Sequence, residues 1–173
     1  AMNQADGIIA VSNFTKQKII EHYGVSADKI EVIHNGIDEC DYANIPERLI
    51  ELKKSGKKIV LFAGRITIQK GPEYFIRAAK RVLEYKKNVI FLVAGSGDME
   101  RQMMLEAANL GVSENVIFVG FLRGDDLNAV YKAADLFVMP SVSEPFGITP
   151  LESIIAGTPV LISKQSGVSE VLA

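Results

Sequence analysis

Two cations lie close together in the sequence, next to an apolar run. Gly64–Arg65 follows the run Lys58–Ala63, and Lys70 precedes Gly71–Pro72, where we expect a helix to begin. A phosphate group is favoured at such a place by two full charges, by free backbone N–H groups and by the helix dipole. Arginine offers a rigid fork of donors and lysine a mobile point charge, so the pair suits a diphosphate. Two solvated surface cations remain the alternative, and the residue order of a Walker loop is missing.

A second candidate site is the segment that contains Glu144 and Glu152, two carboxylates eight residues apart. Gly147 lets a backbone approach a ligand closely, and we expect the amides of residues 146–149 to be free at a helix start, where Pro150 costs little. A carboxylate near a ribose accepts hydrogen bonds from vicinal hydroxyls. If the two carboxyls faced each other, they would instead suit a glycosidase. In the purely structural alternative, Glu144 stabilises the helix dipole and Glu152 is solvated.

The remaining features point less clearly to chemistry. Gly95–Ser96–Gly97 resembles a dinucleotide fingerprint, but Glu100 stands where a third glycine belongs, so a tight turn is the better account and a lining role stays open. His22 and His34 lack ligand-spaced carboxylate or cysteine neighbours, and we assign no metal site. The single cysteine, Cys40, forms no intrachain disulfide and has no activating pattern around it.

Short apolar runs alternate with amphipathic segments along the chain. Most runs are apolar throughout, which is typical of strands covered on both faces in a parallel sheet. The pattern predicts an α/β fold, a Rossmann-like doubly wound parallel sheet with helices on both faces, whose ligands bind at the carboxyl ends of the strands. The expected strands are 7–11, 30–34, 58–63, 89–94, 116–119, 136–139 and 160–163, and the expected helices are 15–22, 47–54, 72–85, 99–110, 126–133 and 148–156.

Composition narrows the class of protein further. The chain has 173 residues, of which 48% are hydrophobic and 23% are charged, so we expect one domain over residues 1–173. Within it, residues 1–38 form a lead-in strand–helix–strand unit, and the polar stretch 35–46 is the weakest seam. A net charge of -2 gives no electrostatic footprint for nucleic acid or anionic lipid. Apolar stretches are too short to span a bilayer, no segment resembles a signal peptide, and one cysteine suits a reducing compartment, so we expect a cytoplasmic protein.

Taken in order, these motifs resemble a known family: the retaining glycosyltransferases of family 4, or glycosyl transferases group 1, which have the GT-B fold and include glycogen, sucrose and sucrose-phosphate synthases. The segment from Glu144 to Glu152 is similar to the E-x7-E signature of that family, and Gly64–Arg65 with Lys70–Gly71 is similar to its G-R-x4-K-G. The resemblance covers essentially the whole chain. Further segments in the order of the family are 5–12, 33–38, 116–120, 134–135 and 157–160.

This resemblance implies roles for the candidate residues. Arg65 and Lys70 would bind the diphosphate of a nucleotide sugar and stabilise its charge as it leaves, Glu144 would contact the transferred sugar and Glu152 the ribose hydroxyls. No metal or other cofactor is expected, because cations and a helix end take the electrostatic role of a metal. The implied catalytic residues are Arg65, Lys70 and Glu144, and the implied donor-binding residues are Gly64, Arg65, Lys70, Leu122, Phe146, Gly147, Ile148, Thr149 and Glu152.

The resemblance also implies what the chain lacks. The acceptor-binding N-terminal domain and the final crossing helices are missing, and Gly167–Val168–Ser169–Glu170 lacks the second glycine of the family, which weakens the case for a phosphate role there. We therefore expect an excised donor domain of a hexosyltransferase that binds a UDP-, GDP- or ADP-sugar without turnover. Its partners would be that nucleotide sugar and the missing domain, through which the parent would meet any membrane. A dinucleotide-dependent oxidoreductase, a non-catalytic module, and an epimerase or phosphorylase remain alternatives.

Overall fold

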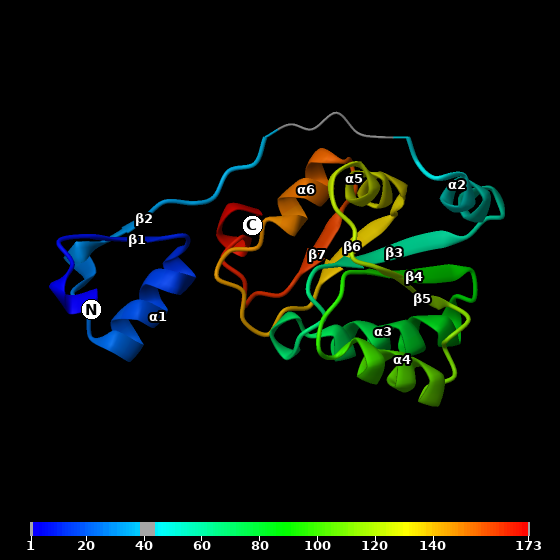
Figure 1. Ribbon diagram of the computed structural model, residues 1–173, viewed down its shortest axis with the longest axis horizontal. Helices are drawn as coiled ribbons and strands as arrows, with labels where there is room; N and C mark the ends of the chain where they lie inside the picture. Colours follow the sequence, from blue (N-terminus) through cyan, green and yellow to red (C-terminus); the bar gives the residue numbers. More distant parts are fainter. Residues whose placement is uncertain (1, 39–43, 173) are drawn as a thin grey trace.

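The computed structural model describes residues 2–38 and 44–172. Residues 44–172 contain a five-stranded parallel sheet that lies between two layers of helices (Figure 1). The strand order is β5-β4-β3-β6-β7, so the chain adds strands first on one side of β3 and then on the other. Such a reversal opens a crevice at the carboxyl ends of the two central strands, here β3 and β6. The strands are β3 (Lys58–Ala63), β4 (Val89–Ala94), β5 (Val116–Gly120), β6 (Leu136–Met139) and β7 (Val160–Ile162).

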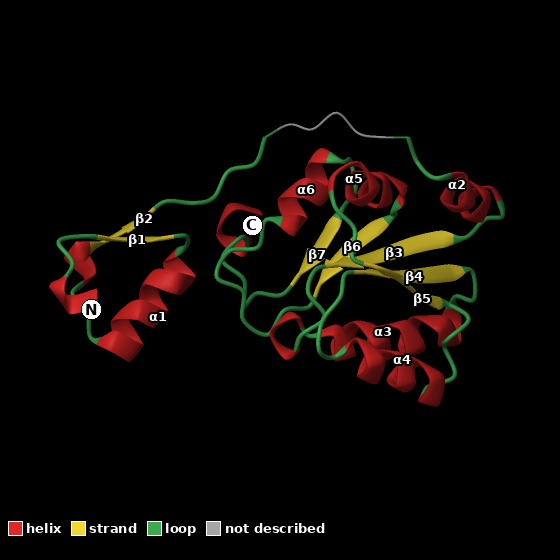
Figure 2. Ribbon diagram, viewed as in Figure 1, coloured by secondary structure: helices red, strands yellow, loops and turns green. Residues whose placement is uncertain are grey.

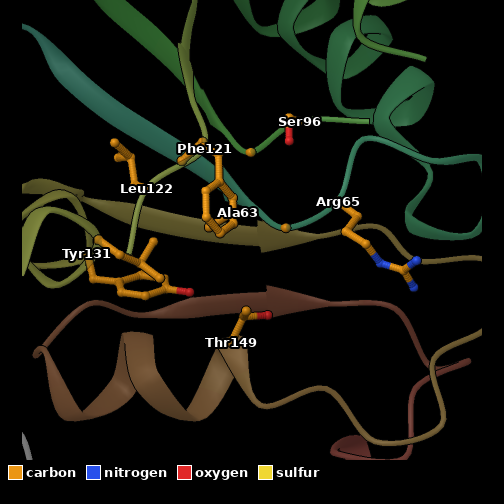
Figure 3. A pocket seen from close by; sticks show the side chains of 11 residues that line it. Ala63, Arg65, Ser96, Phe121, Leu122, Tyr131 and Thr149 are labelled. Atoms are coloured by element: carbon orange, nitrogen blue, oxygen red, sulfur yellow. The ribbon is translucent and has the colours of Figure 1, made fainter. Parts of the chain in front are cut away.

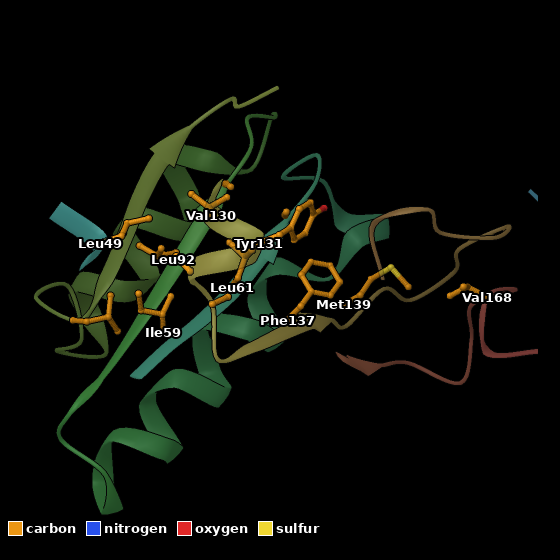
Figure 4. Packing of buried hydrophobic residues seen from close by; sticks show 14 of the residues in the cluster. Leu49, Ile59, Leu61, Leu92, Val130, Tyr131, Phe137, Met139 and Val168 are labelled. Carbon is orange, nitrogen blue, oxygen red and sulfur yellow. The ribbon is translucent and has the colours of Figure 1, made fainter. Parts of the chain in front are cut away.

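Helices cover both faces of this sheet, which confirms the predicted doubly wound fold (Figure 2). Alternate residues of β3 divide between two apolar clusters: Ile59 and Leu61 pack with Tyr131 and Phe137 on one face (Figure 4), and Phe62 packs with α3 and α4 on the other. The helices are α2 (Glu47–Lys54), α3 (Pro72–Tyr85), α4 (Glu100–Asn109), α5 (Gly124–Ala133), α6 (Thr149–Ile155) and α7 (Ser169–Leu172).

The first predicted strands lie in a sheet of their own. β1 (Ile8–Ala10) and β2 (Ile30–Val32) pair in parallel around α1 (Asn13–Tyr23) and enclose a separate small apolar cluster. The seven predicted strands therefore form two sheets, and the seam predicted at 35–46 lies between them. α1 begins two residues earlier than predicted, because Ser12 is extended and its Oγ accepts from the Thr15 amide at 3.0 Å. Cys40 lies outside the described residues.

Asp135 joins the beginning of β6 to the beginning of β3. Its carboxylate accepts hydrogen bonds from the Ile59 amide (2.9 Å) and from Lys58 Nζ (3.1 Å). Desolvation raises the pKa of Asp135, but these bonds and the charges of Lys53 and Lys58 outweigh it and hold the pKa below its ordinary value. Because the folded-state pKa is lowered, the carboxylate stabilises the fold above about pH 4, and this contribution is lost as the pH falls through the folded pKa.

Asp135→Asn is therefore expected to lower the free energy of unfolding by about 1.5–3 kcal/mol at pH 7, the range for hydrogen bonds to a charged group. The difference between the variant and the parent chain should shrink as the pH is lowered from 5 to 3. Urea unfolding at several pH values measures both quantities, and a difference that stays constant with pH would contradict the role of the carboxylate.

Candidate functional site

A cavity of about 410 Å³ lies at the carboxyl ends of the central strands, within the size range of small-molecule sites. Figure 3 shows Arg65 at one end, Leu122 and Tyr131 toward the other, and Thr149 at the start of α6. Four residues predicted to bind a donor line the cavity, namely Gly64, Arg65, Leu122 and Thr149. The other lining residues are Ala63, Ala94, Gly95, Ser96, Phe121, Leu127 and Tyr131.

Two glycines bring β3 and β4 together at the wall of this cavity. The Gly64 amide donates to the Ala94 carbonyl at 2.9 Å, and a Cβ built on Gly95 would lie 1.9 Å from the Gly64 carbonyl oxygen. A Cβ on Gly97 would likewise meet the Ile66 carbonyl oxygen at 2.3 Å. The segment Gly95–Ser96–Gly97 is thus a closely packed turn, as expected from the sequence, and Gly95 and Ser96 also line the cavity.

Lys70 and Glu144, 74 residues apart, form an ion pair between Nζ and Oε2. Their side chains are only 18% and 11% exposed, so the pair is largely shielded from solvent. The two loops that carry them touch, since a Cβ on Gly71 would lie 2.5 Å from the Pro140 carbonyl oxygen. By contrast, the exposed Arg65 has no carboxylate within ion-pair distance in residues 2–38 and 44–172. The free protein therefore presents one unpaired cation at the cavity and one cation already matched to a carboxylate.

The segment after β6 enters α6 with free backbone donors. Gly147 has a φ of +96°, and a Cβ there would lie 3.1 Å from Glu144 Cγ, so glycine allows the loop to fold back on its own carboxylate. In the part of the chain that the structure describes, the amides of Gly147, Ile148 and Thr149 donate to no protein group. α6 begins at Thr149 with Pro150 in its first turn, one residue later than predicted. Phe146 is buried, so its side chain is a packing residue and only its backbone is available to a ligand.

Glu152 is held by a residue that the sequence analysis missed. The Tyr131 hydroxyl donates to Glu152 Oε2 at 2.9 Å, and the ring of Tyr131 is fully buried beside Phe137. Desolvation and the charge of Glu152 raise the pKa of Tyr131 far above its ordinary value, so the phenol stays protonated and remains a donor. A tyrosine on the apolar face of a predicted helix was the available signal, because a buried tyrosine hydroxyl normally has a hydrogen-bond partner.

The histidines lie apart from the cavity. His22 is in the last turn of α1, and His34 lies just beyond β2, where its ring stacks on Phe146. In the described ranges no group of three or more histidine, cysteine, aspartate or glutamate side chains is arranged to hold a metal ion. Nor does any described helix have the length and apolar character needed to cross a bilayer.

An open α/β sheet with a cavity at the reversal of its strand order is typical of the doubly wound folds that bind a ligand at this place. The chain matches the family model of glycosyl transferases group 1 over residues 45–173, and that of glycosyltransferase family 4 over residues 1–39. The chain therefore belongs to the glycosyl transferases group 1 family. This confirms the resemblance and the predicted fold.

Individual relatives agree with this assignment. The chain is 41% identical over 172 residues to an uncharacterized glycosyltransferase of Methanocaldococcus jannaschii, and the match covers 95% of this chain and 44% of that protein. It is 35% identical to the D-inositol 3-phosphate glycosyltransferase of Nocardia farcinica, over 96% of this chain and 39% of that protein. The structure of HepE from Anabaena in complex with UDP-glucose superposes with a TM-score of 0.84 at 26% identity, over 99% of this chain and 48% of that one. The chain thus spans less than half the length of these relatives.

Proposed function

We propose that this chain carries the donor site of a retaining glycosyltransferase, which transfers a hexose from a nucleoside diphosphate sugar to an acceptor. One observation supports this proposal above all others. The carboxyl ends of β3 and β6 bring Arg65, the pair Lys70–Glu144 and the free amides before α6 to one edge of the sheet, although 84 residues separate Arg65 from Thr149. Cations and free amides together suit a diphosphate.

Each side chain then has a role that its surroundings support. Arg65 is free to bind the diphosphate, and Lys70 would exchange its contact with Glu144 for one with a phosphate oxygen as the donor binds. Glu144, released from that pair, would accept hydrogen bonds from the hydroxyls of the sugar. Glu152, which Tyr131 holds in place, would accept from the ribose hydroxyls. Catalysis would come from stabilising the charge of the departing diphosphate, without a metal ion.

The position of the seam bears on domain organisation. The two family models meet between residues 39 and 45, and the two sheets are separated by the same stretch of chain. We propose that residues 44–172 carry the donor site and that the unit 1–38 belongs with the acceptor-binding half of the parent enzyme. On this proposal the chain binds nucleotide but does not turn over, because the acceptor site is contributed by the rest of that half.

Isothermal titration calorimetry of the 173-residue chain with UDP, GDP and ADP tests the donor site. We expect one of the three nucleotides to bind with a dissociation constant below about 1 mM, which corresponds to about -4 kcal/mol. The complexes of HepE with UDP make UDP the first nucleotide to try. Absence of binding by all three at millimolar concentration would refute the proposal, and binding of NAD in their place would favour an oxidoreductase.

Tyr131→Phe separates the ribose contact from the phosphate contact. Without the phenol, Glu152 loses the donor that orients it, and we expect the affinity for the nucleoside diphosphate to fall by about 0.5–1.5 kcal/mol, the usual contribution of one hydrogen bond. Inorganic pyrophosphate has no ribose, so its affinity should not change. Calorimetry with both ligands checks this result, and an equal loss for both would place Tyr131 in general folding rather than in ribose binding.

A further inference from the structure

The carboxylate of Glu170 holds the first turn of α1, more than 150 residues away in the sequence. Its Oε2 accepts from the Asn13 amide at 2.8 Å and from Asn13 Nδ2 at 3.0 Å, and its Oε1 accepts from the Phe14 amide at 2.7 Å. His34 Nε2 lies 3.3 Å from the same carboxylate. Desolvation raises the pKa of Glu170, but these hydrogen bonds outweigh it and hold the pKa below its ordinary value, so the side chain is ionised near neutral pH.

The turn that Glu170 holds is hydrogen-bonded to the loop of residues 144–146, which we call the donor-site loop. The hydroxyls of Ser12 and Thr15 both donate to the Pro145 carbonyl, at 2.5 and 3.1 Å. His34, beside Glu170, stacks on Phe146 with ring centroids 5.7 Å apart and an interplanar angle of 26°. The unit 2–38 thus contacts the loop between Glu144 and Phe146 at two neighbouring points.

The segment around Glu170 completes the enclosure of that loop. The Gly167 amide donates to the Glu144 carbonyl at 3.0 Å, and the Val168 amide donates to the Phe146 carbonyl at 2.8 Å. The backbone carbonyls of residues 144, 145 and 146 therefore all accept hydrogen bonds, and the middle one accepts from the hydroxyls at the beginning of α1. A Cβ on Gly167 would lie 2.2 Å from the Pro145 carbonyl oxygen and 2.5 Å from Ser12 Cβ, so only glycine fits where the three segments meet.

We propose that Glu170 is a positioning residue: by holding the first turn of α1, it keeps Ser12 and Thr15 on the Pro145 carbonyl and so fixes the loop that presents Glu144. This gives the segment 167–170 a role that its single glycine did not suggest. The proposal rests on the proposed function of that loop as part of the donor site. It also means that the unit 2–38 affects donor binding through the loop, without lining the cavity itself.

Amide hydrogen exchange of the 173-residue chain tests this positioning role without any ligand. Glu170→Gln keeps the size of the side chain but removes its charge, so exchange should rise at Asn13 and Phe14. The decisive reporter is the amide of Glu144 in the donor-site loop, which donates to the Gln165 carbonyl at 2.9 Å. We expect its exchange to rise by about tenfold, as for the loss of one stabilising hydrogen bond, and Glu170→Asp to restore part of the protection. The matched control is Glu21→Gln, which removes the same charge from the exposed side of α1.

Calorimetry with UDP, GDP and ADP on the same variants connects the loop to the donor. We expect Glu170→Gln to weaken the nucleotide that binds the parent chain by at least about threefold, and Glu21→Gln to leave its affinity unchanged. A rise in exchange confined to Asn13 and Phe14, with unchanged affinity, would overturn the positioning role. If the parent chain binds none of the three nucleotides, the proposed function fails, while the exchange at Glu144 still decides whether Glu170 holds the loop. Should Glu170→Gln not fold, His34→Ala removes the stacked ring and is expected to raise exchange at Glu144 in the same way.

Discussion

Replacing Lys70 with alanine is expected to weaken nucleoside diphosphate binding by about 1–3 kcal/mol, or roughly 5- to 150-fold. The variant removes a cation from the proposed diphosphate site and also leaves Glu144, whose side chain is 11% exposed, without its counter-charge. Breaking a fully buried ion pair destabilises a fold by about 3–5 kcal/mol, and this pair retains some exposure, so we expect a loss of about 2 kcal/mol in unfolding free energy. Calorimetry and urea unfolding measure the two effects separately.

A double variant distinguishes the two roles of Lys70. Combining Lys70→Ala with Glu144→Gln removes the unmatched carboxylate, so stability should recover while nucleotide binding stays weak. If the double variant recovers the affinity of the parent chain, Lys70 acts only by neutralising the charge of Glu144. That result would contradict a direct contact between Lys70 and a phosphate. The control is Lys132→Ala, because Lys132 is an exposed residue in the last turn of α5 and its loss changes the net charge equally.

Gly95→Ala is expected to be the most destabilising single substitution near the cavity. A Cβ there would lie 1.9 Å from a backbone oxygen of Gly64, and backbone atoms that are hydrogen-bonded at the end of a sheet move less easily than the end of a side chain. We expect a loss of about 3 kcal/mol or more in unfolding free energy, at the upper end of overpacking effects. Because Gly64 must shift and Arg65 follows it, nucleotide affinity should fall as well. Urea unfolding and calorimetry report on the two consequences.

Gly111→Ala is the matched control for this variant. Gly111 also has a positive φ (+67°, compared with +149° at Gly95), but a Cβ there would meet no atom of the described residues within 4 Å. Gly111→Ala should therefore lower the free energy of unfolding by only about 1 kcal/mol, the cost of placing an alanine in a left-handed conformation that glycine adopts freely. Equal destabilisation by the two substitutions would show that backbone strain, and not the contact between β3 and β4, is the reason for glycine at position 95.

Local signals predicted most of the secondary structure. The bounds of β3, β4, β6, α2 and α3 agree with those predicted, because unbroken apolar runs and features such as Pro72 act within a few residues. The beginning of α1 was placed too late and α7 was not predicted. Part of the capping of α1 comes from Glu170, at the opposite end of the chain, and no local pattern shows that contact.

The candidate site divides in the same way. Arg65, Lys70, Glu144 and Gly147 were named because charged residues and glycines follow the predicted strands, and the sheet brings them to one edge. The partner of Glu152 was missed, since Tyr131 looks like an ordinary core residue until the fold places its hydroxyl 2.9 Å from a carboxylate. The separate roles proposed for these side chains remain predictions for binding measurements.

The sequence by itself determined the fold class, the family and the kinds of side chain available at the strand ends, because residue type, periodicity and spacing are properties of the linear chain. Only the tertiary structure decided which of them meet. It paired Lys70 with Glu144, placed Tyr131 on Glu152, separated the first two strands into their own sheet, and joined Glu170 to α1. Each of these contacts links residues far apart in the chain, and the strand order and loop packing that create them depend on the whole fold at once.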